Sequence, residues 1–248
     1  MDAFYVHLAE GSAADPRSQR EWARLVALNA LRRQTVIIHG TALTRAQLGE
    51  LADAGAKLVW SPQSNLRLYG ETTRIADALA VGVTVGLGSD WLPSGSASLL
   101  AELKVARREL HRQGAAVDDR RLVELVTRDA ARIAGLEAHL GRLAPGRPAD
   151  LLVLERRRED PWTNVVEAEP SWVELVTLGG DLAYGREDWL QALVAPDQLA
   201  ATEPVLAWGK RMRLDTRYAV RTAGAAPRLA ELRAALIGAY PQVGPVFA

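Results

Sequence analysis

Residues 35–60, TVIIHGTALTRAQLGELADAGAKLVW, combine two short apolar runs with an amphipathic stretch between them. TVIIH at 35–39 and KLVW at 57–60 contain β-branched residues and are typical of strands. Thr44 and Gln47 form a capping box, which predicts that a helix begins between the two strands. A strand–helix–strand unit of this length predicts parallel strands joined by a helical crossover.

The same alternation extends to both sides of this unit. FYVHL at 4–8 precedes it and TVGLG at 84–88 follows it, which gives four expected strands. The segment rich in Pro, Ser and Asn after residue 60 is expected to be a loop. Further helices are expected at residues 18–33, 73–81, 97–113 and 118–134. Four nearly all-apolar strands, each followed by a helix, predict a parallel sheet buried on both faces.

The sequence changes in character after Gly141. Pro and Gly punctuate this region, a strand is expected at 150–155, and a β-hairpin is expected to turn at Gly179 and Gly180. A last amphipathic helix is expected from about residue 228 to 239. We therefore expect three parts: an α/β part at 1–139, a small β segment at 140–185 and a C-terminal extension at 186–248.

Composition narrows the class of protein. With 30 basic and 30 acidic residues the formal net charge is zero, which does not provide the basic surface that nucleic acids need. No apolar run reaches the roughly 18 to 20 residues that span a bilayer, and the first residues lack the features of a signal peptide. Cysteine is absent, so a metal ion would be held by His, Asp or Glu. We expect a cytoplasmic protein with neither nucleic acid nor membrane as partner.

Four side chains lie at the expected carboxyl ends of strands. His7 and His39 belong to the first and second strands, Glu10 follows the first, and Asp90 follows the fourth. In a βα barrel these ends form one catalytic face. Imidazole and carboxylate are ligands for a divalent metal, and a further carboxylate can transfer protons. A histidine in a strand is also an ordinary core residue, and the spacing alone leaves both interpretations open.

The order of motifs around these residues resembles a known family. The motifs are HLAE at 7–10, IIHG at 37–40, SPQSN at 61–65 and GSD at 88–90, followed by LGRLAPGRPADLLVL at 140–154. Together they resemble the fifth to eighth barrel strands of the amidohydrolase superfamily, in the branch of triazine hydrolases and of cytosine, guanine and adenosine-derivative deaminases. The resemblance covers residues 3–185. It implies an α/β fold: a partial TIM (β/α)8 barrel, a small β-sandwich remnant and a C-terminal helical tail.

The resemblance also implies roles for the four side chains. His7 and Asp90 would be metal ligands for one divalent metal, with zinc first and iron or manganese as alternatives. Glu10 would carry a proton from the attacking water to the leaving nitrogen. His39 would polarise the substrate or assist the water, and Asp90 would also accept a proton. The implied activity is metal-dependent hydrolysis of a C–N bond, not a peptide bond, in a small amide, cyclic amide or amino-heterocycle.

Three further residues are expected near the substrate. Asn65 would touch the substrate or, alternatively, orient its own loop. Trp91 and Ser94 follow Asp90 and would line the pocket. His111 and His139 are expected to be structural.

One part of the family pattern is missing. The first strand of the family carries a His-x-His pair that supplies two metal ligands, and Met1 stands only six residues before His7. We therefore expect a truncated form. Its missing N-terminal half would be encoded in the same gene or supplied by a partner chain; alternatively, the chain would form a homo-oligomer. The alternative is a catalytically inactive fragment, or a degenerate βα-barrel protein that serves in binding. A phosphate-binding barrel without metal is disfavoured, because no Gly-rich phosphate loop follows the later strands.

Overall fold

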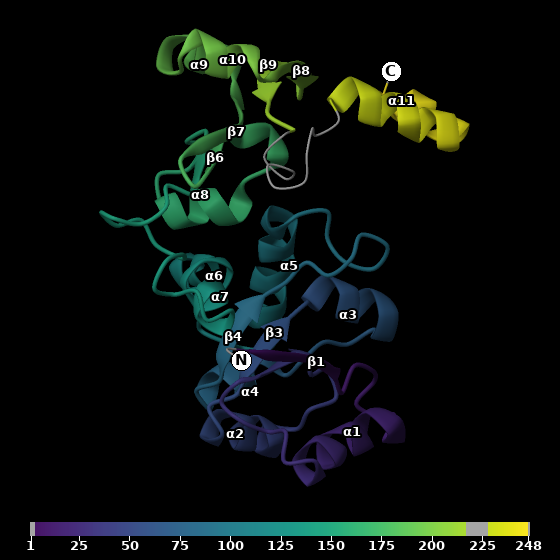
Figure 1. Ribbon diagram of the computed structural model, residues 1–248. Helices are drawn as coiled ribbons and strands as arrows, with labels where there is room; N and C mark the ends of the chain where they lie inside the picture. Colours follow the sequence, from purple (N-terminus) through teal and green to yellow (C-terminus); the bar gives the residue numbers. More distant parts are fainter. Residues whose placement is uncertain (1–2, 217–227, 248) are drawn as a thin grey trace. The chain divides into compact units, whose positions relative to one another are not determined.

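The computed structural model describes residues 3–216 and 228–247, and it groups the chain into two compact units (Figure 1). Unit 1 comprises residues 1–147 and 156–169, and unit 2 comprises residues 148–155 and 170–248. In these described ranges no helix is both long and apolar enough to cross a membrane.

Unit 1 contains a four-stranded parallel sheet in the order β1-β2-β3-β4. Its strands are β1 (Phe4–Leu8), β2 (Thr35–His39), β3 (Lys57–Trp60) and β4 (Thr84–Leu87). The strands lie where the apolar runs predicted them, so the expectation of four parallel strands is confirmed. The sheet is open, with β1 and β4 at its edges, and the described residues contain no closed barrel.

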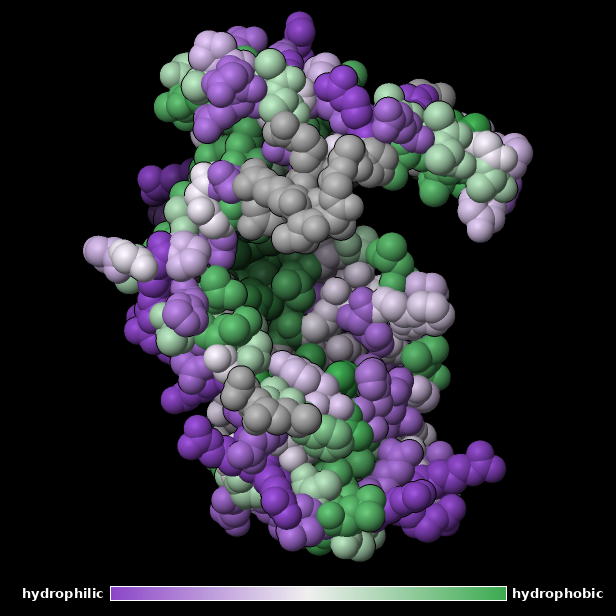
Figure 2. All heavy atoms as spheres, viewed as in Figure 1, coloured by the Kyte–Doolittle hydropathy of each residue, from purple (hydrophilic) through white to green (hydrophobic). Residues whose placement is uncertain are grey.

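Helices connect and cover these strands. They are α1 (Pro16–Ala27), α2 (Arg45–Asp53), α3 (Pro62–Tyr69), α4 (Ile75–Ala80), α5 (Leu99–Arg112), α6 (Asp119–Val126), α7 (Arg128–Ile133) and α8 (Pro161–Glu167). The capping box at Thr44 and Gln47 is present at the start of α2. The outward faces of α1 and α2 are largely hydrophilic (Figure 2). The inner face of α1 buries Trp22 and Leu25, as expected of an amphipathic helix.

Three helix expectations were wrong. The segment after β3 was expected to be a loop, but it forms α3, because Pro62 suits the first turn of a helix and Gly70 ends it in the left-handed conformation at φ 71°. The helix expected at 118–134 is divided at Thr127, whose φ and ψ of −124° and −92° are not helical. The first helix ends at Ala27 instead of continuing to Arg33, and Asn29 beyond it has φ 53°.

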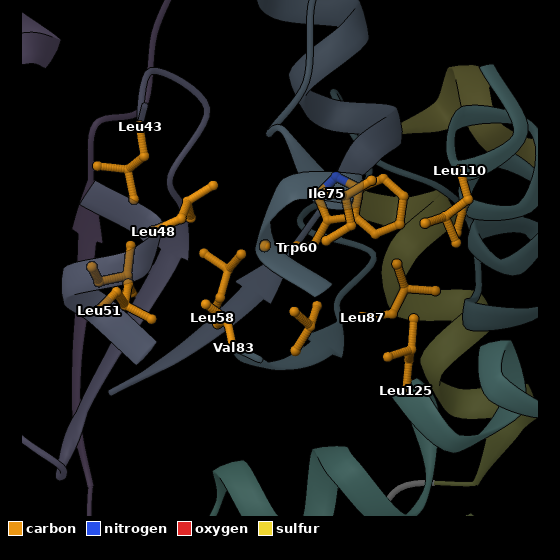
Figure 3. Close-up of a cluster of buried hydrophobic side chains, with 14 of the residues drawn as sticks. Leu43, Leu48, Leu51, Leu58, Trp60, Ile75, Val83, Leu87, Leu110 and Leu125 are labelled. Atoms are coloured by element: carbon orange, nitrogen blue, oxygen red, sulfur yellow. The ribbon is translucent and has the colours of Figure 1, made fainter. Parts of the chain in front are cut away.

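The core of unit 1 lies where the helices pack on the sheet (Figure 3). Its wholly buried side chains include Ile37 from β2, Leu58 and Trp60 from β3, and Leu48 and Leu51 from α2. Because Ile37 and Leu58 are both completely inaccessible to solvent, the two central strands are fixed in place by packing, and with them the residues at their carboxyl ends.

Unit 2 contains a five-stranded antiparallel sheet in the order β5-β6-β7-β9-β8. Its elements are β5 (Leu151–Leu154), η1 (Pro170–Trp172), β6 (Val173–Leu178), β7 (Asp181–Arg186), α9 (Glu187–Leu193), α10 (Pro196–Ala200), β8 (Glu203–Ala207), β9 (Lys210–Leu214), α11 (Leu229–Ala239) and η3 (Pro241–Phe247). The hairpin turn at Gly179 and Gly180 and the last helix are confirmed. The β8–β9 hairpin, within the expected C-terminal extension, was not predicted and pairs in the same sheet as β5 to β7.

Candidate active site

The carboxyl ends of the parallel strands bring His7, Glu10, His39 and Asp90 together. Nε2 of His39 lies 3.5 Å from Oε1 of Glu10 and 4.0 Å from Oδ2 of Asp90. The rings of His7 and His39 are 5.4 Å apart between centroids. These residues come from β1 and the residues just after it, from the end of β2 and from the loop after β4. They meet at the edge of the sheet that the carboxyl ends of its strands form, as parallel strands allow.

At this edge the backbone adopts positive φ angles, which residues other than glycine rarely take. In residues 3–216 and 228–247 five non-glycine residues have positive φ: Ala9, Asn29, His39, Asp90 and Trp208. Three of the five belong to this edge, with φ of 51° at Ala9, 70° at His39 and 59° at Asp90. Left-handed residues of this kind cost free energy and gather at functional sites. Most of the described non-glycine residues with positive φ thus lie at the carboxyl ends of these strands.

The four side chains differ in their access to solvent. His39 is almost wholly buried, with 2% of its side chain exposed, whereas the side chains of Glu10 and Asp90 are 28% and 22% exposed. His7 is exposed. Burial lowers the pKa of His39; the nearby carboxylates of Glu10 and Asp90 raise it in part, and His7 lowers it further. The imidazole of His39 is therefore held towards its neutral form.

A buried set of hydrogen bonds surrounds His39. Nδ2 of Asn65 lies 3.1 Å from Nδ1 of His39, and Oδ1 of Asn65 accepts from the Thr72 hydroxyl at 3.2 Å. The indole N–H of Trp60 donates to Oγ1 of Thr72 at 2.8 Å. The hydroxyl of Thr73 donates to the carbonyl oxygen of His39 at 2.6 Å. Both the ring and the backbone of His39 are thus held by neighbouring side chains.

Helix α3 presents two of its residues to this edge. Asn65 contacts His39, and Tyr69, one helical turn later, donates its hydroxyl proton to Oε1 of Glu10 at 3.1 Å. Residues four apart lie on the same face of a helix, which explains why one helix serves both contacts. Burial raises the pKa of Tyr69, and the negative charge of Glu10 raises it further, so the phenol remains a proton donor.

The loop that carries Asp90 is braced against α3. The hydroxyl of Ser64 donates to that of Ser94 at 3.0 Å, and Arg67 donates to the carbonyl oxygen of Pro93 at 3.1 Å. Ser94 is buried, so this structure places it in the brace. Trp91 is 65% exposed and donates its main-chain N–H to Oδ1 of Asp90 at 2.8 Å.

The donor set can be compared with what a divalent metal requires. Two imidazoles and two carboxylates have the right chemistry for zinc, iron or manganese. Nevertheless, residues 3–216 and 228–247 contain no group of three or more His, Cys, Asp or Glu side chains arranged to hold a metal ion. A catalytic zinc site normally uses three protein ligands. These side chains are therefore of the right chemical type to bind such a metal, but they do not form a complete coordination site by themselves.

Comparison with known proteins agrees with this chemistry. The family model described as the Amidohydrolase family matches residues 2–183. The chain belongs to this family. The resemblance inferred from the four motifs is thereby confirmed.

Two curated relatives illustrate the match of this amidohydrolase chain. A 5-methylthioadenosine/S-adenosylhomocysteine deaminase from Teredinibacter turnerae is 30% identical over 160 residues, covering 61% of this chain and 36% of the relative. An S-triazine hydrolase from Gordonia rubripertincta is 32% identical over 105 residues, covering 41% of this chain and 22% of the relative. The chain thus spans well under half the length of either protein.

Solved structures of amidohydrolases share the fold. An adenosine deaminase from Xanthomonas campestris with bound zinc matches with a TM-score of 0.66 and 21% identity, covering 72% of this chain and 44% of that one. Guanine deaminase from E. coli matches with a TM-score of 0.62 and 21% identity, covering 73% and 48%. At this identity the likeness concerns the fold alone.

Several residues around the candidate site were not found from the sequence. They are Trp60, Tyr69, Thr72 and Thr73. A signal existed for Tyr69: if the segment after Pro62 is taken as a helix, Asn65 and Tyr69 fall on one face. No comparable signal exists for the two threonines, because they lie in a connection whose path depends on tertiary packing.

Proposed function

We propose that this chain forms the later part of the active site of a metal-dependent hydrolase. The bond broken is a C–N bond, other than a peptide bond, in a small amide, cyclic amide or amino-heterocycle. The observation that carries the proposal is the meeting of His7, Glu10, His39 and Asp90 at one strained edge of the sheet. The relatives named as deaminase and triazine hydrolase favour an amino-heterocycle among these substrates.

His7 and Asp90 are the residues we assign to the metal. Zinc is the first choice, because the matched adenosine deaminase structure contains it, with iron and manganese as alternatives. When bound, such a metal supplies the acidity that makes water a nucleophile near neutral pH. The other ligands that a catalytic site needs would come from outside residues 3–216 and 228–247.

The remaining side chains handle protons and orientation. Glu10, held by the Tyr69 hydroxyl, takes a proton from the attacking water and delivers it to the leaving nitrogen. His39 donates a hydrogen bond to the substrate carbonyl or ring nitrogen. Asp90 accepts a proton from the attacking water. Trp91 borders the substrate. The complete burial of Asn65 supports a role in holding His39 rather than direct contact with the substrate.

The open sheet fits a part of a barrel. We propose that β1 to β4 correspond to strands five to eight of a TIM (β/α)8 barrel and that the β5–β9 unit includes a small β-sandwich segment. At the free edge β1, Phe4 and Tyr5 are 42% and 48% exposed, which suits pairing with a further strand. That strand would belong to an N-terminal half or to a second copy of the chain. The division into residues 1–139, 140–185 and 186–248 and the cytoplasmic location stay predictions.

Zinc binding by the purified full chain tests the metal assignment. We would measure zinc affinity by competition with a chromophoric chelator, for the wild type and for His7→Ala and Asp90→Asn. Asn tolerates the left-handed backbone at position 90, so this variant removes charge without adding strain. Each variant is expected to weaken binding at least about tenfold. His111→Ala, at an exposed position on α5, is the matched control and should leave the affinity unchanged.

Hydrolysis is tested with the wild type and with a further variant, Glu10→Gln. Ammonia release from amino-substituted purines and triazines is expected for the zinc-loaded chain when an N-terminal half is supplied, and Glu10→Gln should abolish it. Equal zinc affinity in the wild type and both ligand variants would refute the metal assignment. That result would favour the alternative of an inactive or binding protein built on the same fold.

A further inference from the structure

We infer that a buried chain of hydrogen bonds fixes the tautomer of His39, so that the neutral imidazole carries its proton on Nε2. The members of the chain, in order, are Trp60, Thr72, Asn65 and His39. Each of them is at most 8% exposed, so the side chains depend on one another for hydrogen bonds. Only the role of this proton in catalysis rests on the proposed function; the tautomer itself does not.

The direction of the chain is set at its first member. The indole N–H of Trp60 can donate a hydrogen bond but cannot accept one. Oγ1 of Thr72, 2.8 Å away, must therefore be the acceptor in this contact. The hydroxyl keeps its own proton for a second partner, and Oδ1 of Asn65 lies 3.2 Å from it. The amide oxygen of Asn65 is thereby turned towards Thr72.

The amide nitrogen of Asn65 must then face His39. Nδ2 lies 3.1 Å from Nδ1 of the imidazole, and an amide nitrogen only donates, so Nδ1 must be an unprotonated acceptor. The reversed amide would place NH2 against Oγ1 of Thr72, which already accepts from Trp60. The Thr72 proton would then lose its acceptor, at a cost of about 1 to 3 kcal/mol for a buried group. Only the observed orientation satisfies every member of the chain.

The proton on Nε2 points into the site. Nε2 lies 3.5 Å from Oε1 of Glu10 and 4.0 Å from Oδ2 of Asp90, on the side of the ring opposite to Asn65. The ring cannot easily turn, because only 2% of the His39 side chain is exposed and Nδ1 is held by the buried amide of Asn65. Resting His39 is therefore a hydrogen-bond donor to whatever occupies the space beside the two carboxylates, and it is not a base through Nε2. Asn65, Thr72 and Trp60 are positioning residues that act through His39.

Nitrogen NMR of the metal-free full chain labelled with ¹⁵N-histidine tests the inference without substrate. At about pH 8 a histidine with an ordinary or lowered pKa is neutral, and correlations between ring protons and ring nitrogens identify the tautomer. The signals of His39 are assigned from their loss in His39→Gln. We expect Nε2 to be the protonated nitrogen. A wild-type His39 that is protonated on Nδ1, or on both nitrogens, would overturn the inference, and this result needs no variant to fold.

Asn65→Asp provides the decisive variant. A carboxylate at this position can accept from both Thr72 and His39 but cannot donate, so the tautomer is expected to change to Nδ1–H. Thr73→Val is the matched control and should retain Nε2–H. It removes the hydrogen bond to the carbonyl oxygen of His39 but leaves the hydrogen bonds among Trp60, Thr72, Asn65 and His39 intact. Retention of Nε2–H in a folded Asn65→Asp protein would refute the inference. Failure to hydrolyse any substrate would not affect it, so the two proposals are tested separately.

Discussion

The carboxylate of Glu102 on α5 accepts a hydrogen bond from the main-chain N–H of Gln63 on α3, with 2.9 Å between Oε1 and the nitrogen. Glu102 is completely inaccessible to solvent and also accepts a hydrogen bond from Ser96. One buried side chain therefore joins the loop that carries Asp90 to the helix that carries Asn65. Within residues 3–216 and 228–247 its second oxygen, Oε2, has no hydrogen-bond partner.

This burial predicts a particular pH dependence of stability. Burial raises the pKa of Glu102 above its ordinary value of 4.5, and the charge of Asp90 adds to the effect. The folded chain therefore binds the proton more strongly than the unfolded chain. The associated stability is fully present below the unfolded pKa and is lost as pH rises through the folded pKa.

Glu102→Gln removes this titration. The free energy of unfolding of the variant, relative to the wild type, is expected to increase as pH rises from about 4.5 to about 8. Urea unfolding of both proteins over this pH range measures the difference. Glu159→Gln, at an exposed position, is the control and should run parallel to the wild type. Parallel curves for Glu102→Gln would show that the buried carboxyl does not influence stability in this way.

Gly95 is expected to be essential for the loop that carries Asp90. A Cβ at this position would overlap the carbonyl oxygen of Ser89 and would lie 3.1 Å from that of Trp91, and both are rigid backbone atoms. Gly95→Ala should therefore destabilise unit 1 by about 2 kcal/mol or more. Gly49 lies within α2, and a Cβ added there would meet no atom within 4 Å, so Gly49→Ala should stabilise by about 1 kcal/mol. Thermal unfolding of the two variants should shift in opposite directions, and a shift in the same direction would contradict this account of the loop.

A turn in unit 2 offers an independent prediction. The β8–β9 hairpin turns through Trp208 and Gly209, with φ of 55° and 74°, because Ala207 pairs with Lys210. Asn-Gly is the favoured pair in a two-residue turn of this kind, whereas a bulky residue in the left-handed region costs about 1 to 2 kcal/mol. Trp208 is 66% exposed, so little packing is lost on replacement. Trp208→Asn should raise the melting temperature of unit 2 and Gly209→Ala should lower it. Destabilisation by Trp208→Asn would show that the indole contributes contacts that outweigh the backbone strain.

The sequence predicted the strands and the His, Glu and Asp residues at their ends better than it predicted the residues that hydrogen-bond to these side chains. Short apolar runs locate β1 to β4, and a His or Asp at the end of such a run is visible because strand ends meet in a parallel sheet. The composition of α3 concealed the helix, since Pro and Ser at the start of a helix have the same local signature as a loop. With α3 taken as a loop, the common face of Asn65 and Tyr69 could not be recognised. The bonds made by Thr73 and Glu102 join segments that are 34 and 39 residues apart in the sequence, so they follow only from the packed structure.

The contact between Tyr69 and Glu10 gives a prediction that separates burial from charge. The hydroxyl of Tyr69 lies 3.1 Å from Oε1 of Glu10. Burial is the largest cause that raises the pKa of Tyr69 above its ordinary value of 10.0, followed by Glu10, with a smaller contribution from Asp90. Glu10→Gln should therefore lower this pKa more than Asp90→Asn does, and neither should restore the ordinary value. The phenol is one of five tyrosines, so its titration is isolated as the ultraviolet absorbance difference between each protein and the same protein with Tyr69→Phe. If Glu10→Gln leaves the titration of Tyr69 unchanged while Asp90→Asn moves it, the phenol faces Asp90 in solution, and the assignment of Tyr69 to holding Glu10 is wrong.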